Sequence, residues 1–339
     1  MKLLIFTQKV DKNDSILGFF HNWLIEISKR IDEVQVICLE VGKVDLPKNI
    51  TVYSLGKEKG SSQFKYIINL YKYLWLIHGS YDKVFVHMNQ EYVLLAGWYW
   101  KLKNIPVYMW RNHPKGSPLT RLAVALSTKV FCTSTASFTA RFKKTLIMPA
   151  GIDIKIFKPI EGMFRKKYSV CMVGRISPIK HIKLGIEVVG KLIASGSQVS
   201  FNIIGSPTER DIKYYEELKD YATKNNLSNS ITFTPALSPE RLPEIYSSHE
   251  ICLNLTESGS FDKTIVESTS CGAIPLVSNY SLKGLLPSVC ITMASPEAVA
   301  DSLQKLFEAH VKLEIQDELK SFVKSQSLDA LLDKLFIEI

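Results

Sequence analysis

Short apolar runs alternate with amphipathic stretches along the whole chain, and this alternation predicts a repeated β–α architecture. The runs are almost continuously apolar, which is typical of strands buried on both faces of a parallel sheet. The stretches between them, such as 19–31, 182–193 and 210–225, repeat their apolar positions with helical periodicity. The expected strands are residues 2–7, 34–39, 50–55, 83–88, 106–110, 129–134 and 145–149 in the first half, and 168–174, 199–205, 230–235, 250–255, 274–278 and 289–293 in the second.

The order of these elements predicts two doubly wound α/β domains. The chain of 339 residues is long enough for two cores, and Pro and Gly interrupt the pattern over residues 149–162. We therefore expect an N-terminal domain over 1–152, a C-terminal domain over 153–318, and a helix over 319–339 that packs back on the N-terminal domain. Ligands of such sheets bind at the carboxyl ends of the strands, so two facing domains suit the transfer of a group between two substrates.

Composition sets the expected cellular setting. The chain is 46% hydrophobic and 22% charged, which excludes general disorder. Its start turns polar after six residues, and its longest apolar run, 92–100, is much shorter than the roughly 18 residues of a membrane span. The six cysteines are scattered without metal-ligand spacing, which favours buried, reduced thiols. We expect a cytoplasmic protein with no metal site.

The segment MVGRISPIKH (172–181) is the strongest local motif. A strand ends at Gly174, Arg175 follows at once, and Lys180 comes five residues later at the start of a helix. Glycine lets the backbone approach a ligand, and the two cations can converge on a diphosphate. A tight turn with two solvated cations is the alternative interpretation. Neither a P-loop nor a GxGxxG fingerprint is present, which disfavours ATP hydrolysis and NAD chemistry.

A second motif spans residues 255–278, where a strand leads through a Gly/Ser loop into a helix. Asp262 is expected to be the N-cap of a helix from Lys263 to about Ser270. A Gly-rich loop before a helix N-terminus is a ready anion site. Glu267 lies one turn into the helix, where its carboxylate could accept hydrogen bonds from a sugar diol. Alternatively, Asp262 only caps the helix and Glu267 is a surface residue.

Together these motifs resemble the retaining glycosyltransferases of family 4, also called glycosyl transferase group 1. The resemblance covers nearly the whole chain, the first half in layout only, and it implies the GT-B fold of two Rossmann-like doubly wound α/β domains facing across a cleft. It also implies metal-independent hexosyl transfer from a nucleotide diphosphate sugar to an acceptor hydroxyl, with no other cofactor. The segments that carry it are GIDIKIFKP (151–159), MVGRISPIK (172–180), IIG (203–205) and FDKTIVESTSCGAIPLV (261–277).

The resemblance implies roles for individual residues. Arg175 and Lys180 would hold the donor diphosphate and stabilise the departing charge. Glu267 is similar to the second Glu of the family's Glu-x7-Glu motif and would bind the nucleotide ribose. Gly259 stands at the position of the first Glu, which leaves Glu257, Asp262 or a backbone amide to contact the donor sugar.

Further site residues follow from the same resemblance. His113 looks like the family's cleft histidine, although a lone loop histidine is more often simply solvated. Weaker acceptor-side candidates are His87, Thr133 and Ser134. The remaining donor-binding residues that the resemblance implies are Gly18, Gly174, Gly205, Ser258, Gly259, Ser260, Asp262, Lys263 and Thr264.

Charge divides unevenly between the two halves of the chain. Residues 1–150 hold 21 Lys and Arg against 10 Asp and Glu, whereas residues 151–339 hold 21 against 23. Lysines alternate with aromatic residues over 57–75 and again over 98–103, a composition suited to an anionic bilayer surface. Burial of the same rings in the core is the alternative. We expect peripheral association with the cytoplasmic membrane and a lipid-linked or cell-envelope glycan acceptor.

Two other functions stay open at this point. A nucleotide-sugar 2-epimerase would use the same fold, but it needs acid and base carboxylates, and the first half shows no conspicuous pair. A nucleic-acid-binding protein would exploit the basic half, but it has no recognisable recognition motif and leaves the second motif unexplained. We therefore expect no nucleic-acid partner. The sequence leaves open whether the donor nucleotide is UDP, GDP or ADP.

Overall fold

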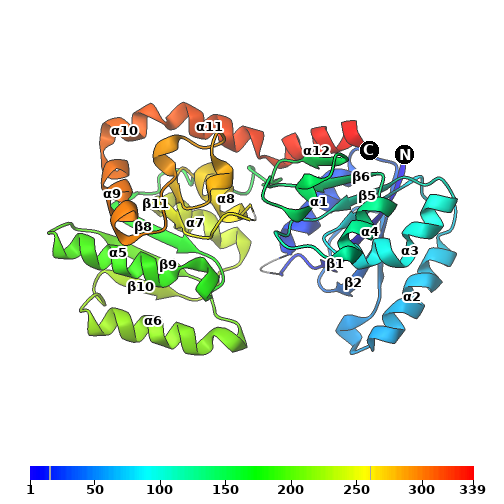
Figure 1. The fold of residues 1–339 in the computed structure, drawn as a ribbon, viewed down its shortest axis with the longest axis horizontal. Coiled ribbons are helices and arrows are strands. Elements are labelled where there is room, and N and C mark those ends of the chain that lie inside the picture. Colours follow the sequence, from blue (N-terminus) through cyan, green and yellow to red (C-terminus); the bar gives the residue numbers. More distant parts are fainter. Residues whose placement is uncertain (15–16, 260) are drawn as a thin grey trace. The chain divides into compact units, whose positions relative to one another are not determined.

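The computed structural model describes residues 1–14, 17–259 and 261–339, and its chain divides into two compact units (Figure 1). Unit 1 comprises Met1–Met148 and Leu331–Ile339, and unit 2 comprises Pro149–Ala330. The division therefore falls at residues 148 and 149, where the sequence places it at 152 and 153. The chain returns to unit 1 for its last residues.

Unit 1 is built on a seven-stranded parallel sheet in the order β3-β2-β1-β4-β5-β6-β7. The order reverses between β1 and β4, which makes their carboxyl ends the switch point of this sheet. The strands are β1 (Lys2–Val10), β2 (Glu33–Val41), β3 (Ile50–Ser54), β4 (Lys83–His87), β5 (Val107–Trp110), β6 (Lys129–Cys132) and β7 (Thr145–Ile147). The helices are α1 (Gly18–Ser28), α2 (Gln63–Leu76), α3 (Gln90–Leu102), α4 (Pro118–Leu126) and most of α12 (Leu328–Glu338).

Unit 2 is built on a five-stranded parallel sheet in the order β10-β9-β8-β11-β12, with its switch point between β8 and β11. The strands are β8 (Lys166–Val173), β9 (Ser200–Ile204), β10 (Ile231–Thr234), β11 (His249–Asn254) and β12 (Ile274–Val277). The helices are α5 (Ile182–Ala194), α6 (Ile212–Lys224), α7 (Leu242–Ser248), α8 (Lys263–Ser270), α9 (Pro296–Phe307), α10 (Ala309–Glu314) and α11 (Gln316–Ser325).

The apolar runs form the centre of each unit, as expected for strands covered on both faces. Leu3, Leu4, Ile5 and Phe6 of β1 are fully buried, and β8 buries its apolar end in the same way. All six cysteines are buried and free, which confirms their interpretation as core thiols. Among the described residues, no helix combines the length and apolar character needed to cross a bilayer.

Every expected strand is present except the last, and that prediction is wrong. Residues 289–293 contain a single 3-10 turn, Ser288–Cys290, and Ile291 meets Val277 only through an isolated bridge. Cys290 is nonetheless fully buried. The apolar run is therefore buried beside β12, as a strand would be, but it does not pair along its length.

The expected single helix over 319–339 is also wrong, because α11 and α12 are separated at Gln326 and Ser327. The Gln326 side chain accepts a hydrogen bond from Ala150 N, and its backbone carbonyl accepts from Gly151 N and Ile152 N. These bonds tie the break to the first residues of unit 2. Beyond it, α12 packs on unit 1, where Asp333 pairs with Arg30 at 2.6 Å and Glu338 pairs with Lys129 at 2.8 Å.

Candidate functional site

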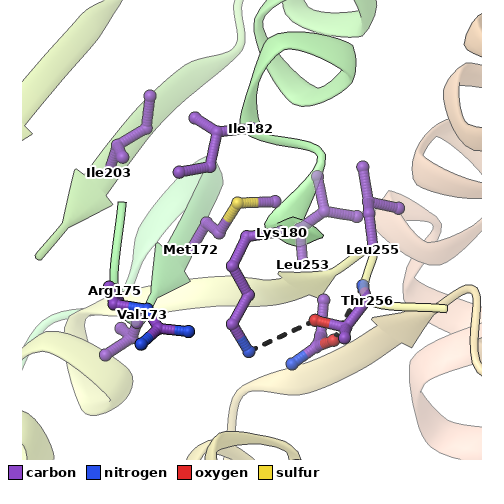
Figure 2. A pocket seen from close by; sticks show the side chains of 11 residues that line it. Met172, Val173, Arg175, Lys180, Ile182, Ile203, Leu253, Leu255 and Thr256 are labelled. Atoms are coloured by element: carbon purple, nitrogen blue, oxygen red, sulfur yellow. Dashed lines mark hydrogen bonds between the residues drawn. The ribbon is translucent and has the colours of Figure 1, made fainter. Parts of the chain in front are cut away.

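A pocket opens in unit 2 at the carboxyl ends of β8 and β11, which is the switch point of this sheet (Figure 2). It holds about 270 Å³ of empty space, including space open to solvent. Strand residues give it apolar walls, while polar side chains from the following loops border it. The lining residues are Met172, Val173, Gly174, Arg175, Lys180, Ile182, Ile203, Leu253, Asn254, Leu255 and Thr256.

Two glycines shape the backbone beside this pocket. Gly174 N donates to Ile204 O at 3.0 Å, so the pairing of β8 with β9 continues past the end of β8. A Cβ atom built on Gly205 would lie 1.9 Å from Gly174 O, a distance that no side chain can tolerate. The two predicted glycines therefore let the two strand ends approach each other. Their role is structural whatever ligand the pocket takes.

Lys180 lies at the centre of a polar network that borders the pocket. Its Nζ pairs with Asp262 Oδ2 and lies 3.3 Å from Thr256 Oγ1, the contact drawn in Figure 2. Asn254 Nδ2 donates to the same Asp262 oxygen at 2.9 Å and to Thr264 Oγ1 at 3.1 Å. Loops after β8 and β11 thereby fix one ammonium group at the pocket, with its side chain about four-fifths buried.

Arg175 contributes a second cation whose guanidinium is exposed and borders the pocket. Within the described residues it makes no hydrogen bond or ion pair, in contrast to Lys180. With Asp262 paired to Lys180, the ammonium and the guanidinium leave one net positive charge at the pocket, an arrangement that can bind an anionic group.

Asp262 occupies the predicted N-cap position of α8, but its side chain makes no capping hydrogen bond. Its carboxylate instead accepts from Lys180 and Asn254, so the simple capping interpretation is wrong. Helix α8 itself begins at Lys263 and ends at Ser270, as expected.

The rest of the loop before α8 has several partners. Ser258 Oγ accepts from Tyr280 N at 2.9 Å, Gly259 is buried, and the predicted residue Ser260 lies outside the described residues. Glu257 is exposed, and its Oε1 lies 3.6 Å from Nε2 of His181. Neither Glu257 nor Gly259 is among the residues that line the pocket.

Glu267 is half-buried on α8 and belongs to a second cluster, with Lys263 one turn earlier on the same helix and Tyr246 on α7. Tyr246 Oη donates to Glu267 Oε2 at 3.3 Å. Burial raises the pKa of Glu267 to about 7, against the opposing charge of Lys263. Burial also lowers the pKa of Lys263, and the charge of Glu267 opposes that shift. Although both residues keep some exposed area, the Lys263 Nζ atom itself is buried.

The shifted pKa of Glu267 has a consequence for stability. Because the folded-state pKa lies above the ordinary value of 4.5, the folded protein holds this proton over a pH range where the unfolded chain releases it. The stability that the protonated group contributes is therefore lost as pH rises through about 7. The carboxylate is nevertheless the form that can accept hydrogen bonds from a ligand hydroxyl.

The remaining predicted residues belong to unit 1. Gly18 is the first residue of α1, and its N donates to Asp14 O at 3.0 Å. His113 is exposed in the loop after β5, where its Nδ1 accepts from Lys115 N at 3.0 Å. His87 is a buried ring stacked on Phe20 at 4.1 Å, which identifies it as a core residue.

Asn254 is a pocket residue that the sequence motifs did not indicate, and Ser177 is a buried residue of the segment 172–181 that was not singled out there. Asn254 lines the pocket at the end of β11, and a polar residue closing an apolar strand was the only signal for it. Ser177 lies directly before the turn that carries Lys180, and its buried hydroxyl has no hydrogen-bond partner within the described chain.

Parts of the chain are similar in sequence to known proteins. Residues 153–315 match the family model described as glycosyl transferases group 1. The D-inositol 3-phosphate glycosyltransferase of Acidothermus cellulolyticus is 24% identical over 37% of this chain and 31% of its own length. That of Gordonia bronchialis is 30% identical over 33% of this chain and 25% of its own. The matches thus span about a third or less of these curated relatives.

Solved structures resemble the chain over almost its whole length. The Anabaena Alr3699/HepE crystal structure in complex with UDP and glucose has a TM-score of 0.76 at 18% identity, covering 99% of this chain and 98% of that one. A glycosyltransferase from Rickettsia africae ESF-5 has a TM-score of 0.77 at 13% identity, covering 99% and 97%. At these identities the likeness shows a shared two-unit α/β fold.

Proposed function

We propose that the chain, whose residues 153–315 match the model of the glycosyl transferases group 1 and whose fold resembles GT-B structures, is a retaining glycosyltransferase of family 4 that uses a nucleotide diphosphate sugar. The observation that carries this proposal is the pair of cations at the unit 2 pocket, with Lys180 fixed by Asp262 and Arg175 uncommitted. That arrangement suits the two phosphates of a donor. Gly174, which lines the pocket, adds no side chain to it, and Gly205 lets the end of β9 approach Gly174 closely.

The proposed reaction breaks the bond between the anomeric carbon and the donor diphosphate, and it forms a bond from that carbon to an acceptor oxygen. Charge separates in the transition state, so the main task is to stabilise the departing diphosphate. Lys180 and Arg175 would do this, and they would supply the positive charge that a metal ion supplies in other enzymes. We therefore propose metal-independent transfer, for which turnover should persist in EDTA.

Retention would follow from attack on the same face of the sugar from which the diphosphate departs. The acceptor proton would then pass to a diphosphate oxygen, so that no protein nucleophile is needed. Asp262 is the carboxylate joined to the pocket network, and Lys180 and Asn254 already engage it. This engagement supports a positioning role for Asp262 over a covalent one.

The names of similar proteins narrow the proposal. Alr3699/HepE is described in complex with UDP and with UDP-glucose, which supports a UDP-sugar as the donor. The curated relatives are D-inositol 3-phosphate glycosyltransferases, which supports an acceptor that carries phosphate. We further propose that the acceptor is lipid-linked or part of a cell-surface glycan, and that the protein works at the cytoplasmic face of a membrane, on account of its basic first half.

A thermal-shift screen of UDP-, GDP- and ADP-sugars tests the donor assignment. A ligand that binds the folded state stabilises it by about 2.7 kcal/mol at a concentration of 100 Kd. We expect a UDP-sugar to raise the midpoint by several degrees and Lys180→Ala to reduce that rise. If none of the three nucleotide sugars raised the midpoint, the donor site would be contradicted. In a separate assay, incubation of the protein with the nucleotide sugar alone tests the alternative function: an epimer formed without acceptor would identify an epimerase instead of a transferase.

Donor affinity should also depend on pH through Glu267, which we propose binds the nucleotide ribose. Its carboxylate form accepts the ribose hydroxyls, so donor affinity is expected to increase from pH 6 to pH 8, through its pKa of about 7. Calorimetric titration across this range measures the effect. Glu267→Gln should remove the pH dependence, while Glu216→Gln, an exposed carboxylate on α6, should retain it. An unchanged pH profile in Glu267→Gln would show that Glu267 does not bind the donor.

A further inference from the structure

Helix α2 of unit 1 carries a line of large apolar side chains that point away from the core. Phe64, Ile68, Tyr71 and Trp75 are all exposed, Trp75 at 82% and Phe64 at 73%. Their spacing places them within an arc of roughly 60° on the helix. The opposite face buries Leu70 and Leu74 against the sheet. The helix is therefore apolar on the solvent side as well as on the core side.

Helix α3 extends this line into a two-helix surface. Tyr71 Oη donates to Leu95 O at 2.8 Å, and Trp98 Nε1 donates to the same carbonyl at 2.9 Å. Both side chains therefore reach one carbonyl of α3, and α2 lies beside α3 in the fold (Figure 1). Leu102, one turn after Trp98, is 75% exposed. We call this set the apolar patch: Phe64, Ile68, Tyr71, Trp75, Trp98 and Leu102.

Lysines without acidic partners lie in the same segments of the chain as the apolar patch. Those in its segments that form no ion pair within the described chain are Lys59, Lys65, Lys72, Lys101 and Lys103, all exposed. Lys57, in contrast, pairs with Glu40 at 3.2 Å. The sequence contains no Asp or Glu over 59–81 or over 92–152. The positive charge at this surface is therefore not neutralised by neighbouring carboxylates of α2 or of the end of α3.

We propose that the apolar patch and its lysines dock this protein on an anionic phospholipid bilayer, with α2 and α3 lying in the headgroup region. Aromatic and aliphatic side chains on the exposed face of helices flanked by lysine suit this interface, because the rings enter the headgroup boundary while the ammonium groups meet lipid phosphates. This inference gives the membrane association proposed above a surface, and it does not depend on the donor pocket of unit 2.

A bilayer fits this surface better than a protein partner. A symmetric contact between two copies would place the same lysines against one another. Lysine is depleted at protein interfaces, whereas aromatic residues are enriched. Helix α2, which carries the apolar line, is 14 residues long, which is shorter than the three to four heptads that a coiled coil needs.

Vesicle flotation of the full chain tests the proposal. Phosphatidylcholine vesicles with about a quarter phosphatidylglycerol should carry the protein, and pure phosphatidylcholine vesicles should not. Neutralising Lys65, Lys72 and Lys101 together to Gln should lower binding on the order of a hundredfold, since each lysine contributes roughly fivefold near an anionic leaflet. The matched control, Lys158, Lys167 and Lys224 to Gln, changes three exposed lysines of unit 2 and should bind like wild type.

Tryptophan emission gives a second readout that reports insertion directly. Trp75 and Trp98 are exposed, whereas Trp23, Trp100 and Trp110 are buried. Anionic vesicles should shift the emission to shorter wavelength, and Trp75→Phe with Trp98→Phe should abolish that shift. Trp75→Ser with Trp98→Ser should also weaken flotation, while the control Phe164→Ser with Leu313→Ser, at exposed apolar positions of unit 2, should not.

Two results would overturn the proposal. One is equal binding to neutral and anionic vesicles, or to neither, with an unchanged emission spectrum. The other is a wild-type protein that binds no vesicles but forms a concentration-dependent dimer in sedimentation. If Trp75→Ser with Trp98→Ser dissociated that dimer, the patch would bind a second copy of the chain. Donor binding measured by thermal shift remains independent of both results, so failure here is distinguishable from failure of the transferase assignment.

Discussion

Replacing Lys180 with Ala is expected to lower kcat/KM by about 10²–10³-fold, the loss seen when one group that stabilises transition-state charge is removed. Asp262 and Thr256 hold Lys180 Nζ at the pocket, so the ammonium group is positioned before the reaction begins. Transfer from a UDP-sugar, followed by release of UDP, measures the effect. Most of the loss should appear in kcat, because the diphosphate carries more negative charge in the transition state than in the bound donor.

Lys183→Ala provides the matched control on the next turn of the same segment. Lys183 is more than half exposed, and its ion pair with Glu187 is long, at 3.9 Å, and therefore weak. Removal of Lys183 should leave kcat/KM near the wild-type value. Folding is checked by the thermal midpoint, which should move little in Lys180→Ala because Asn254 still donates to Asp262. Wild-type turnover in a folded Lys180→Ala protein would contradict the assignment of the diphosphate site to this pocket.

The sequence predicts the fold well because burial on both faces of a parallel sheet leaves continuous apolar runs. This holds for β1, whose residues Leu3 to Phe6 are fully buried. It fails at residues 289–293, where an equally apolar run is buried beside β12 without pairing along its length. Hydrophobicity records which residues leave water, and it does not record which backbone groups they bond to.

The candidate site divides in a similar way between local and distant contacts. Gly174, Arg175 and Lys180 belong to one strand–loop–helix segment, so their spacing alone places them around one pocket. The pairing of Lys180 with Asp262 joins residues 82 positions apart and depends on β8 lying beside β11. The local motif therefore located the cations but assigned Asp262 to a cap, because a cap is the local use of an Asp before a helix. Only the family resemblance placed Asp262 among the donor-binding residues.

Gly205→Ala is expected to destabilise unit 2 by about 3 kcal/mol or more and to abolish donor binding. The added Cβ would lie 1.9 Å from Gly174 O, so the ends of β8 and β9 must separate. That movement breaks the bond from Gly174 N to Ile204 O, at 3.0 Å. It also displaces Gly174, which lines the pocket beside Arg175. Urea unfolding followed by circular dichroism measures the loss.

Gly196→Ala separates this steric contact from backbone strain. Gly196 has a φ of +88° and no heavy atom within 4 Å of an added Cβ, so its substitution should cost only about 1–2 kcal/mol of conformational strain. All five tryptophans precede residue 111 and lie in unit 1, so the tryptophan-monitored transition follows unit 1 and should be far less affected than the circular dichroism. If Gly205→Ala proved as stable as Gly196→Ala and bound the donor normally, the two strand ends could separate without cost. The close approach at Gly174 would then have no part in forming the pocket.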